Sequence, residues 1–252
     1  MRIQLIRNAT MKITYAGKTL LTDPMLSARH SLPSFAGAEK NPTVDLPLSI
    51  PDILDGVQGV LVSHDHPDHL DSEAISALPR DVPVFCQPED AGRFKEAGFE
   101  RVLPVDDSVP WEGLFVTRTG GRHGQGKTGE MMGTVSGFVL KAETEPTVYW
   151  AGDTVWCEQV EGVIRDHAPD VIVTHSGGAA FPGDAPIIMD VEQTMEVLRT
   201  APEATVVAVH MDALDHCWVT RTVLRETADR AGITPSRLLI PGDGESVSLP
   251  SG

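Results

Sequence analysis

The chain has 252 residues, of which 41% are hydrophobic and 22% charged, so it is long enough to bury a sizeable core. This composition excludes wholesale disorder and a fibrous protein. The formal net charge of -16 disfavours binding to nucleic-acid backbones and to anionic membranes.

Cysteine usage and hydropathy indicate where the protein works. The three cysteines are few, odd in number and widely spaced, which favours a reducing compartment over a disulfide scaffold. No run approaches ~18 apolar residues, and the first residues do not resemble a secretory signal. We therefore expect a cytoplasmic protein without a membrane-spanning helix.

Strands dominate the first part of the chain. Residues 3–15 alternate between apolar and polar side chains, which is typical of half-buried strands, and residues 18–22 form another. Residues 27–52 have no clear period and contain four prolines, which indicates a long loop, usually functional at this length. The sequence then predicts a buried strand at 59–62, a helix at 72–78 capped by Ser72, a helix at 88–97, and strands at 82–85, 102–103, 108–111 and 114–119.

Helices and strands alternate in the second half. Residues 120–133 are rich in glycine and are predicted to form a flexible loop without a helix. No linker divides the chain, so we expect a single domain over residues 1–252, with two sheets covered by helices. The remaining predicted elements are strands at 135–141, 147–150, 171–174, 205–209, 238–240 and 246–249, and helices at 158–167, 190–200 (capped by Asp190) and 219–231.

The segment with the most chemistry is His64-Asp65-His66-Pro67-Asp68-His69, directly after a buried strand. Imidazole and carboxylate are the ligands that borderline divalent metals prefer. Alternation puts His64 and His66 on one face of an extended loop, and the turn at Pro67 aims Asp68 and His69 at a second position. One loop can therefore supply ligands to two metal ions; the alternative is a polar surface turn.

Three further candidate ligands each follow a predicted strand. His123 comes after one predicted strand, Asp153 after a second, and His210 after a third. Together with the histidine-rich loop, this order resembles the metallo-β-lactamase fold superfamily, and the resemblance covers nearly the whole chain. It implies an α/β fold, namely a four-layer αββα sandwich.

The resemblance also implies a role for each residue. It places His64, His66 and His123 in a first metal site, Asp68, His69 and His210 in a second, and Asp153 between them as a bridging ligand. Each later residue has an ordinary alternative: a surface position for His123, a helix cap for Asp153, and replacement by the nearby His216 for His210.

Other residues carry weaker signals. Asp23 resembles an acidic residue that orients a ligand histidine in this superfamily, although a plain turn explains it equally well. His175 lies at a strand end, where it could bind substrate or donate a proton, and Asp68 could also act as the proton donor. His216 has a status similar to that of His175. The offset of Cys217 does not match a ligand position.

The implied activity is hydrolysis by water that a bound divalent ion activates. Zinc is the first expectation, with manganese or iron as alternatives, and one or two ions would bind. The pattern is most similar to the UlaG-like group, which includes an ascorbate-phosphate lactonase, and so implies a small lactone, ester or phosphoester substrate. We expect no nucleic-acid or membrane partner, and homo-oligomerisation stays open.

Two other functions are alternatives to this one. The first is a phosphodiesterase or nuclease on the same fold, for which the negative charge disfavours long nucleic acid. The second is a non-catalytic metal-binding or ligand-binding protein. The presence of all seven expected ligands argues against it.

Overall fold

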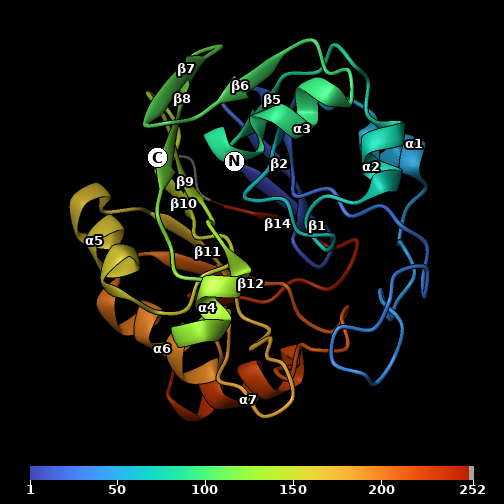
Figure 1. The fold of residues 1–252 in the computed structure, drawn as a ribbon. Coiled ribbons are helices and arrows are strands. Elements are labelled where there is room, and N and C mark those ends of the chain that lie inside the picture. The colour runs from blue at the N-terminus through green and yellow to red at the C-terminus, as the bar shows by residue number, and fades with distance from the viewer. Residues whose placement is uncertain (250–252) are drawn as a thin grey trace.

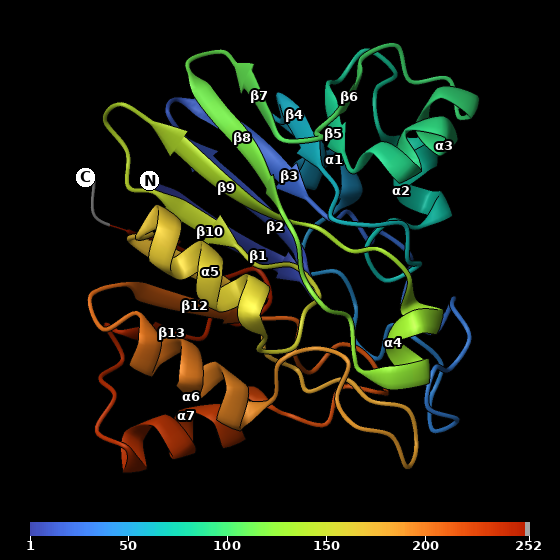
Figure 2. The same ribbon diagram turned by 60° about the vertical axis from the view of Figure 1, so that its left-hand side comes forward.

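Two seven-stranded sheets pack face to face in the computed structural model, which describes residues 1–249, and helices cover the outer face of each sheet (Figures 1 and 2). The predicted four-layer αββα sandwich is thus confirmed. In sheet order, the first sheet consists of β14 (Ser246–Ser248), β1 (Arg2–Arg7), β2 (Thr10–Tyr15), β3 (Lys18–Thr22), β4 (Gly59–Leu61), β5 (Val84–Cys86) and β6 (Val102–Pro104). The second consists of β13 (Leu238–Leu239), β12 (Thr205–Val209), β11 (Val171–His175), β10 (Val148–Trp150), β9 (Gly137–Ala142), β8 (Leu114–Thr119) and β7 (Ser108–Trp111).

The core between the sheets follows from the alternation of the strands. Met11, Ile13 and Tyr15 point inward from β2 and are fully buried against side chains of the second sheet. The Tyr15 hydroxyl has two acceptors in that sheet's region, the carbonyls of Leu140 at 3.2 Å and Pro146 at 2.9 Å. A polar tip on an apolar ring thereby joins the two layers without leaving an unsatisfied group.

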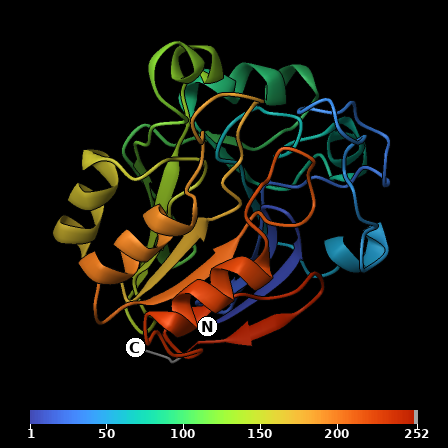
Figure 3. The same ribbon diagram turned by 90° about the horizontal axis from the view of Figure 1, so that it is seen from below.

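Each outer layer is formed by three helices. Those on the second sheet lie in a row along its outer face (Figure 3), where buried side chains of α6 and α7 pack on the sheet. Helices α1 (Ile50–Leu54), α2 (Ser72–Ala77) and α3 (Ala91–Glu96) cover the first sheet, and α5 (Glu158–His167), α6 (Val191–Thr200) and α7 (Arg221–Arg230) cover the second. A 3₁₀ turn (Pro88–Asp90) precedes α3.

Helix caps explain where two of these helices begin. Asp190 caps α6 as predicted, since its carboxylate accepts a hydrogen bond from the Gln193 N–H at 2.9 Å. The prediction that Ser72 caps α2 is wrong, because Asp71 holds that position and accepts from the Ala74 N–H at 2.7 Å. A carboxylate at this place satisfies one of the first free N–H groups of the helix.

One helix contradicts the sequence prediction. Residues 120–133, predicted to be helix-free, include α4 (Gly126–Met132), which lies apart from the helices that cover the sheets (Figure 2). A Cβ on Gly129 would lie 2.8 Å from the carbonyl oxygen of Gly124, so glycine lets this helix approach the preceding loop closely. The Thr128 hydroxyl of this helix donates to the Asp184 carboxylate at 3.1 Å, and tertiary contacts can override the low helix propensity of glycine.

The sheet topology brings the polar motifs to one edge. Strands β3 to β6 are parallel in the first sheet and β10 to β13 in the second, so their carboxyl ends share an edge within each sheet. Loops at that edge of an α/β sheet commonly carry the binding site. Among residues 1–249, no helix has the length and apolar character needed to cross a membrane.

Candidate metal centre

All seven residues predicted as metal ligands lie together where the two sheets meet. The loop after β4 supplies four of them, and the other three follow β8, β10 and β12. In chain order they are His64, His66, Asp68, His69, His123, Asp153 and His210, of which only His66 is not fully buried.

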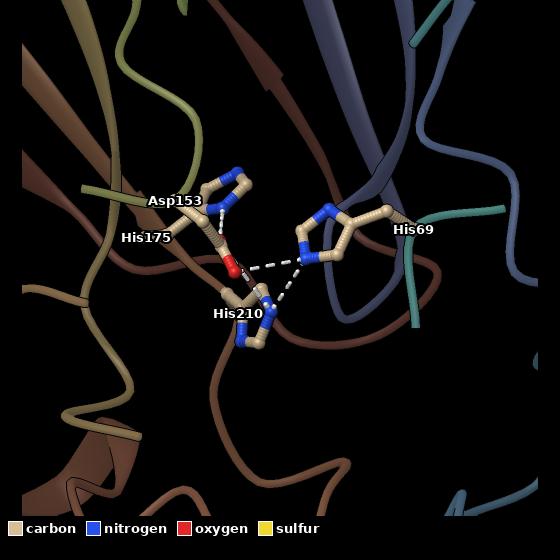
Figure 4. A group of neighbouring side chains, drawn as sticks. All are labelled: His69, Asp153, His175 and His210. Atoms are coloured by element: carbon tan, nitrogen blue, oxygen red, sulfur yellow. Dashed lines mark hydrogen bonds and ion pairs between the residues drawn. The ribbon is translucent and has the colours of Figure 1, made fainter. Parts of the chain in front are cut away.

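The donor atoms form two neighbouring groups. His64, His66 and His123 offer nitrogens that all lie within 4.8 Å of one another, and the His64 Nε2 is 2.8 Å from the His66 Nδ1. The second group consists of His69, Asp153, His175 and His210 (Figure 4). Asp68 lies beside it, with Oδ2 at 3.5 Å from the Nε2 atoms of both His69 and His210.

The Asp153 carboxylate lies between the two groups. Its Oδ2 is 3.0 Å from the His69 Nε2 and 3.5 Å from the His123 Nε2, while its Oδ1 is 3.7 Å from the His210 Nε2. The alternative role as a helix cap is wrong, because α5 begins at Glu158 with Cys157 at the cap position. This is the location that a carboxylate bridging two cations requires.

Neighbouring acceptors fix the orientation of the histidines. The His123 Nδ1 donates to the Ile187 carbonyl at 2.9 Å, and the His69 Nδ1 lies 2.6 Å from the Asp23 carboxylate. In the neutral ring each Nδ1 therefore carries the proton, so that each Nε2 can present a lone pair toward the centre. Metal-binding histidines are held in this way, so the donor set fits divalent ions.

Charge at the centre leads to the same conclusion. Burial opposes the charged form of Asp153, yet His69 and His210 hold the pKa of its carboxyl well below the ordinary value. Burial likewise opposes a charge on His69, but Asp153 and Asp68 raise its pKa well above the ordinary value. Buried carboxylates here demand positive charge nearby, which protons or a divalent cation can supply.

Two backbone positions at the centre, Gly152 and His210, have unusual conformations. Gly152 has φ +66°, and a Cβ there would lie 2.5 Å from the Ser136 carbonyl oxygen, so only glycine fits directly before Asp153. His210 has φ +63°, uncommon for a non-glycine residue, and its N–H donates to the Asn8 carbonyl at 3.0 Å. Strained positions of this kind cluster at functional sites.

His175, for which the sequence suggested substrate binding or proton donation, has hydrogen-bond partners on both sides of its ring. Its ring is fully buried, and the Trp150 indole N–H donates to its Nε2 at 3.0 Å. The Nδ1 therefore carries the proton and donates to the Asp153 Oδ1 at 2.6 Å. Since both nitrogens are occupied and the ring does not line the cavity, the geometry gives no support to His175 as a proton donor to substrate. It positions Asp153 instead.

A cavity of about 160 Å³ opens above the centre. The long loop at 27–52 contributes Phe35 and the glycine-rich segment at 121–134 contributes Met132, so both segments reach it. Phe181 and Ile187 come from a loop in which the sequence offered no signal. The complete lining is Phe35, His66, Pro67, Asp68, His123, Met132, Asp153, Phe181, Ile187 and His216.

One carboxylate fastens the wall of this cavity. Asp215 accepts hydrogen bonds from the Phe35 N–H at 3.0 Å, from the Asn41 side chain at 2.8 Å and from the Ser34 hydroxyl. Burial would raise the pKa of Asp215, but the hydrogen bonds from Ser34 and Asn41 lower it well below the ordinary value. The loop at 34–41 is thereby attached to the segment that carries His216.

His216 and Cys217 lie near His210 without replacing it as a donor. His216 lines the cavity and belongs to neither donor group. The Cys217 thiol lies 3.5 Å from the His210 Nδ1, and its Sγ is in neither group. Burial raises the pKa of that thiol.

Comparisons with known proteins agree with this geometry. Residues 18–211 match the family model described as a beta-lactamase superfamily domain. The chain is 39% identical to the UPF0173 protein YddR of Bacillus subtilis, over 99% of this chain and 100% of that protein. It is 27% identical to a UPF0173 metal-dependent hydrolase of Azorhizobium caulinodans, over 70% of this chain and 73% of that one.

Two solved structures are similar over their whole length. The isothiocyanate hydrolase from Delia radicum gut bacteria has a TM-score of 0.94 and 36% identity, covering 100% of both chains. A protein from Veillonella parvula, described as a possible metal-dependent hydrolase, has a TM-score of 0.95 and 35% identity, covering 99% of both chains.

Proposed function

The chain belongs to the beta-lactamase superfamily and is a metal-dependent hydrolase, and from this premise we propose that it hydrolyses small, uncharged organic isothiocyanates. The cavity above the donor groups carries the proposal. Its outer lining is apolar, with Phe35, Met132, Phe181 and Ile187, and within residues 1–249 it includes neither lysine nor arginine. A substrate that fits there is small and carries an apolar substituent.

The same lining distinguishes among the substrates that the sequence left open. Phosphate and carboxylate groups are usually recognised by Arg and Lys side chains, which provide charge-assisted hydrogen bonds. The lining offers none, and the net charge of -16 adds repulsion. A phosphoester or phosphodiester therefore has less support than an uncharged carbon electrophile, and the isothiocyanate hydrolase among the similar structures favours the N=C=S group over a lactone or ester.

The proposed reaction consumes one water molecule for each isothiocyanate. R–N=C=S and H₂O give R–NH₂ and O=C=S, as the water oxygen bonds to the central carbon, both protons pass to nitrogen and the C–N bond breaks. A bound divalent ion, for which we propose zinc because imidazoles dominate the donor set, would supply Lewis-acid activation of water. The chain's own contribution is to hold the donors in place and to keep the apolar substituent away from bulk water.

The test is a substrate panel with the protein loaded with zinc. We expect phenethyl isothiocyanate to be consumed with equal release of amine and carbonyl sulfide. A chelator should abolish this turnover, and zinc should restore it. Turnover of p-nitrophenyl acetate, a γ-lactone or bis(p-nitrophenyl) phosphate with no turnover of any isothiocyanate would overturn the proposal. Repeating the restoration with manganese and iron tests the choice of zinc.

Location and partners complete the proposal. We propose a cytoplasmic protein that acts on a small molecule and binds neither nucleic acid nor membranes. All three cysteines are free thiols, in keeping with a reducing compartment. Cell fractionation tests the location, and detection of the protein in a secreted or membrane fraction would contradict it.

A further inference from the structure

His216 lines the cavity but belongs to neither group of metal-donor residues. Its side chain is 5% exposed, and its Nδ1 has no hydrogen-bond partner within the part of the chain that the structure describes. An unpaired polar atom at such depth costs free energy unless a molecule in the cavity satisfies it, and His216 lines the cavity where such a molecule would lie.

The other histidines around the cavity are already engaged. His66 and His123 also line it, but both belong to the first donor group. His175 is turned away from the cavity and has both nitrogens occupied by Trp150 and Asp153. His216 is therefore the cavity-lining imidazole that is free to exchange a proton with a substrate.

The backbone that carries the ring is anchored, and an aromatic neighbour packs against the ring. Its backbone carbonyl accepts from the Ala180 N–H at 3.0 Å, and the preceding residue, Asp215, is tied to the loop at 34–41. The Phe35 ring meets the imidazole edge to face, with centroids 5.2 Å apart and planes at 85°. An imidazole oriented in this way pays little entropy to meet a substrate.

We propose that His216 is a catalytic residue that protonates the substrate nitrogen, an inference that rests on the proposed isothiocyanate hydrolysis. As the water oxygen bonds to the central carbon, the C=N electron pair moves to nitrogen, which takes a proton from the imidazole. The ring regains a proton from the attacking water, and the second proton of that water accompanies the amine as the C–N bond breaks. Burial lowers the pKa of His216, so near neutral pH the ring offers one donor and one acceptor, as such a relay needs.

The experiment uses a series of para-substituted phenyl isothiocyanates with the zinc-loaded protein. The nitrogen that leaves as a basic aniline needs protonation most, and the one that leaves as 4-nitroaniline needs it least. We expect His216→Asn to lower kcat by roughly 10²–10⁴-fold for the 4-methoxy compound, with a much smaller loss for the 4-nitro compound. His216→Gln, with a longer side chain, should give the same graded pattern.

Controls separate this role from a structural one. His167→Asn is the matched variant, because the His167 Nδ1 also lacks a partner among the described residues while its ring lies outside the cavity lining. It should retain normal kcat across the series. Metal content and near-UV circular dichroism of every variant should equal those of the parent protein.

The outcomes that overturn the inference are distinct. An equal loss across the series, or no loss, would show that His216 only shapes the cavity while isothiocyanate hydrolysis stands. If the parent protein turns over no isothiocyanate, the proposed function fails, and the role of His216 fails with it.

Discussion

The Oδ2 of Asp23 lies 2.6 Å from the His69 Nδ1 and 2.7 Å from the Ser63 hydroxyl oxygen. The Oδ1 of the same carboxylate accepts from the Ser63 N–H at 2.7 Å. One side chain at the end of β3 thus fastens both ends of the histidine-rich loop. The sequence left Asp23 open between a plain turn and an orienting residue, and this contact assigns it the orienting position.

Asp23→Asn tests that orientation. The amide keeps the size of the side chain but offers a single oxygen, so it can no longer serve Ser63 and the His69 Nδ1 together as a charged acceptor. Loss of such a supporting partner typically weakens metal binding by about 10–100-fold. We expect a zinc affinity lower by that factor, measured by competition with a chromogenic chelator.

The control for Asp23 is Asp166→Asn on the exposed face of α5, where the carboxylate pairs with its neighbour Arg165. That variant should bind zinc like the parent protein. An unchanged zinc affinity in Asp23→Asn would show that Ser63 and the loop backbone hold His69 without it.

Gly177 is predicted to be irreplaceable for the position of His210. A Cβ at Gly177 would lie 2.0 Å from the His210 carbonyl oxygen and 2.9 Å from the Cys217 Sγ. Since that oxygen belongs to the backbone, Gly177→Ala must displace the strand end that carries His210. We expect a loss of about 1–3 kcal/mol in the free energy of unfolding, as for other overpacked sites, together with weaker metal binding.

Gly92→Ala is the matched control for Gly177. It lies on the exposed side of α3 with no atom within 4 Å of the added Cβ, so the same substitution should stabilise the protein by roughly 0.5–1 kcal/mol. Urea unfolding of both variants measures the difference. Equal stabilities would mean that the backbone near His210 yields freely.

Local patterns in the sequence predicted the strands and helices, whereas the resemblance to the metallo-β-lactamase superfamily implied the four-layer fold and the cluster. Burial of one face produces the alternation around Met11 and Ile13 in a strand. It likewise produces the helical pattern at 158–167. The assignment of ligands to the donor groups is what that resemblance implies, because the order of the motifs along the chain matches that of the superfamily. The motifs can be recognised in the sequence without knowing which side chains are in contact.

The remainder depends on contacts between distant segments. In α4, the Thr128 hydroxyl donates to the Asp184 carboxylate at 3.1 Å, a contact with a distant segment that helix propensity does not register. The role of His175 depends on the Trp150 indole, which fixes the ring's tautomer. Phe181 reaches the cavity through a loop with no period or motif. Such features are properties of the folded chain rather than of any segment.

The lowered pKa of Asp215 predicts how the stability of the loop at 34–41 depends on pH. Its pKa is depressed in the folded protein, so the stability it contributes is complete above the unfolded value of about 3.9 and is lost as pH falls through the lower folded value. Asp215→Asn should therefore destabilise the loop by a constant amount from pH 8 to about pH 5. The gap to the parent protein should narrow only below about pH 4.

Amide exchange of residues 35–39 at a series of pH values measures that gap, corrected for the intrinsic exchange rate. Glu203→Gln, at an exposed position outside this loop, should leave it unchanged. A gap that shrinks between pH 8 and pH 6 would contradict the assignment of the anchoring charge to Asp215.

The last prediction contrasts two aspartates that precede helices. Asp153→Asn removes charge where the carboxylate lies between the two donor groups, whereas Asp190→Asn makes the same change at a true helix cap. Asn caps a helix about as well as Asp, so Asp190→Asn should keep its helical content, its metal and its activity. In Asp153→Asn the cations lose a shared anionic ligand, so we expect reduced zinc content by atomic emission, a large loss of activity, and an unchanged far-UV circular dichroism spectrum. Full zinc occupancy with near-normal activity in Asp153→Asn would remove the central residue of the proposed centre, because a neutral amide cannot replace a bridging carboxylate between two buried cations.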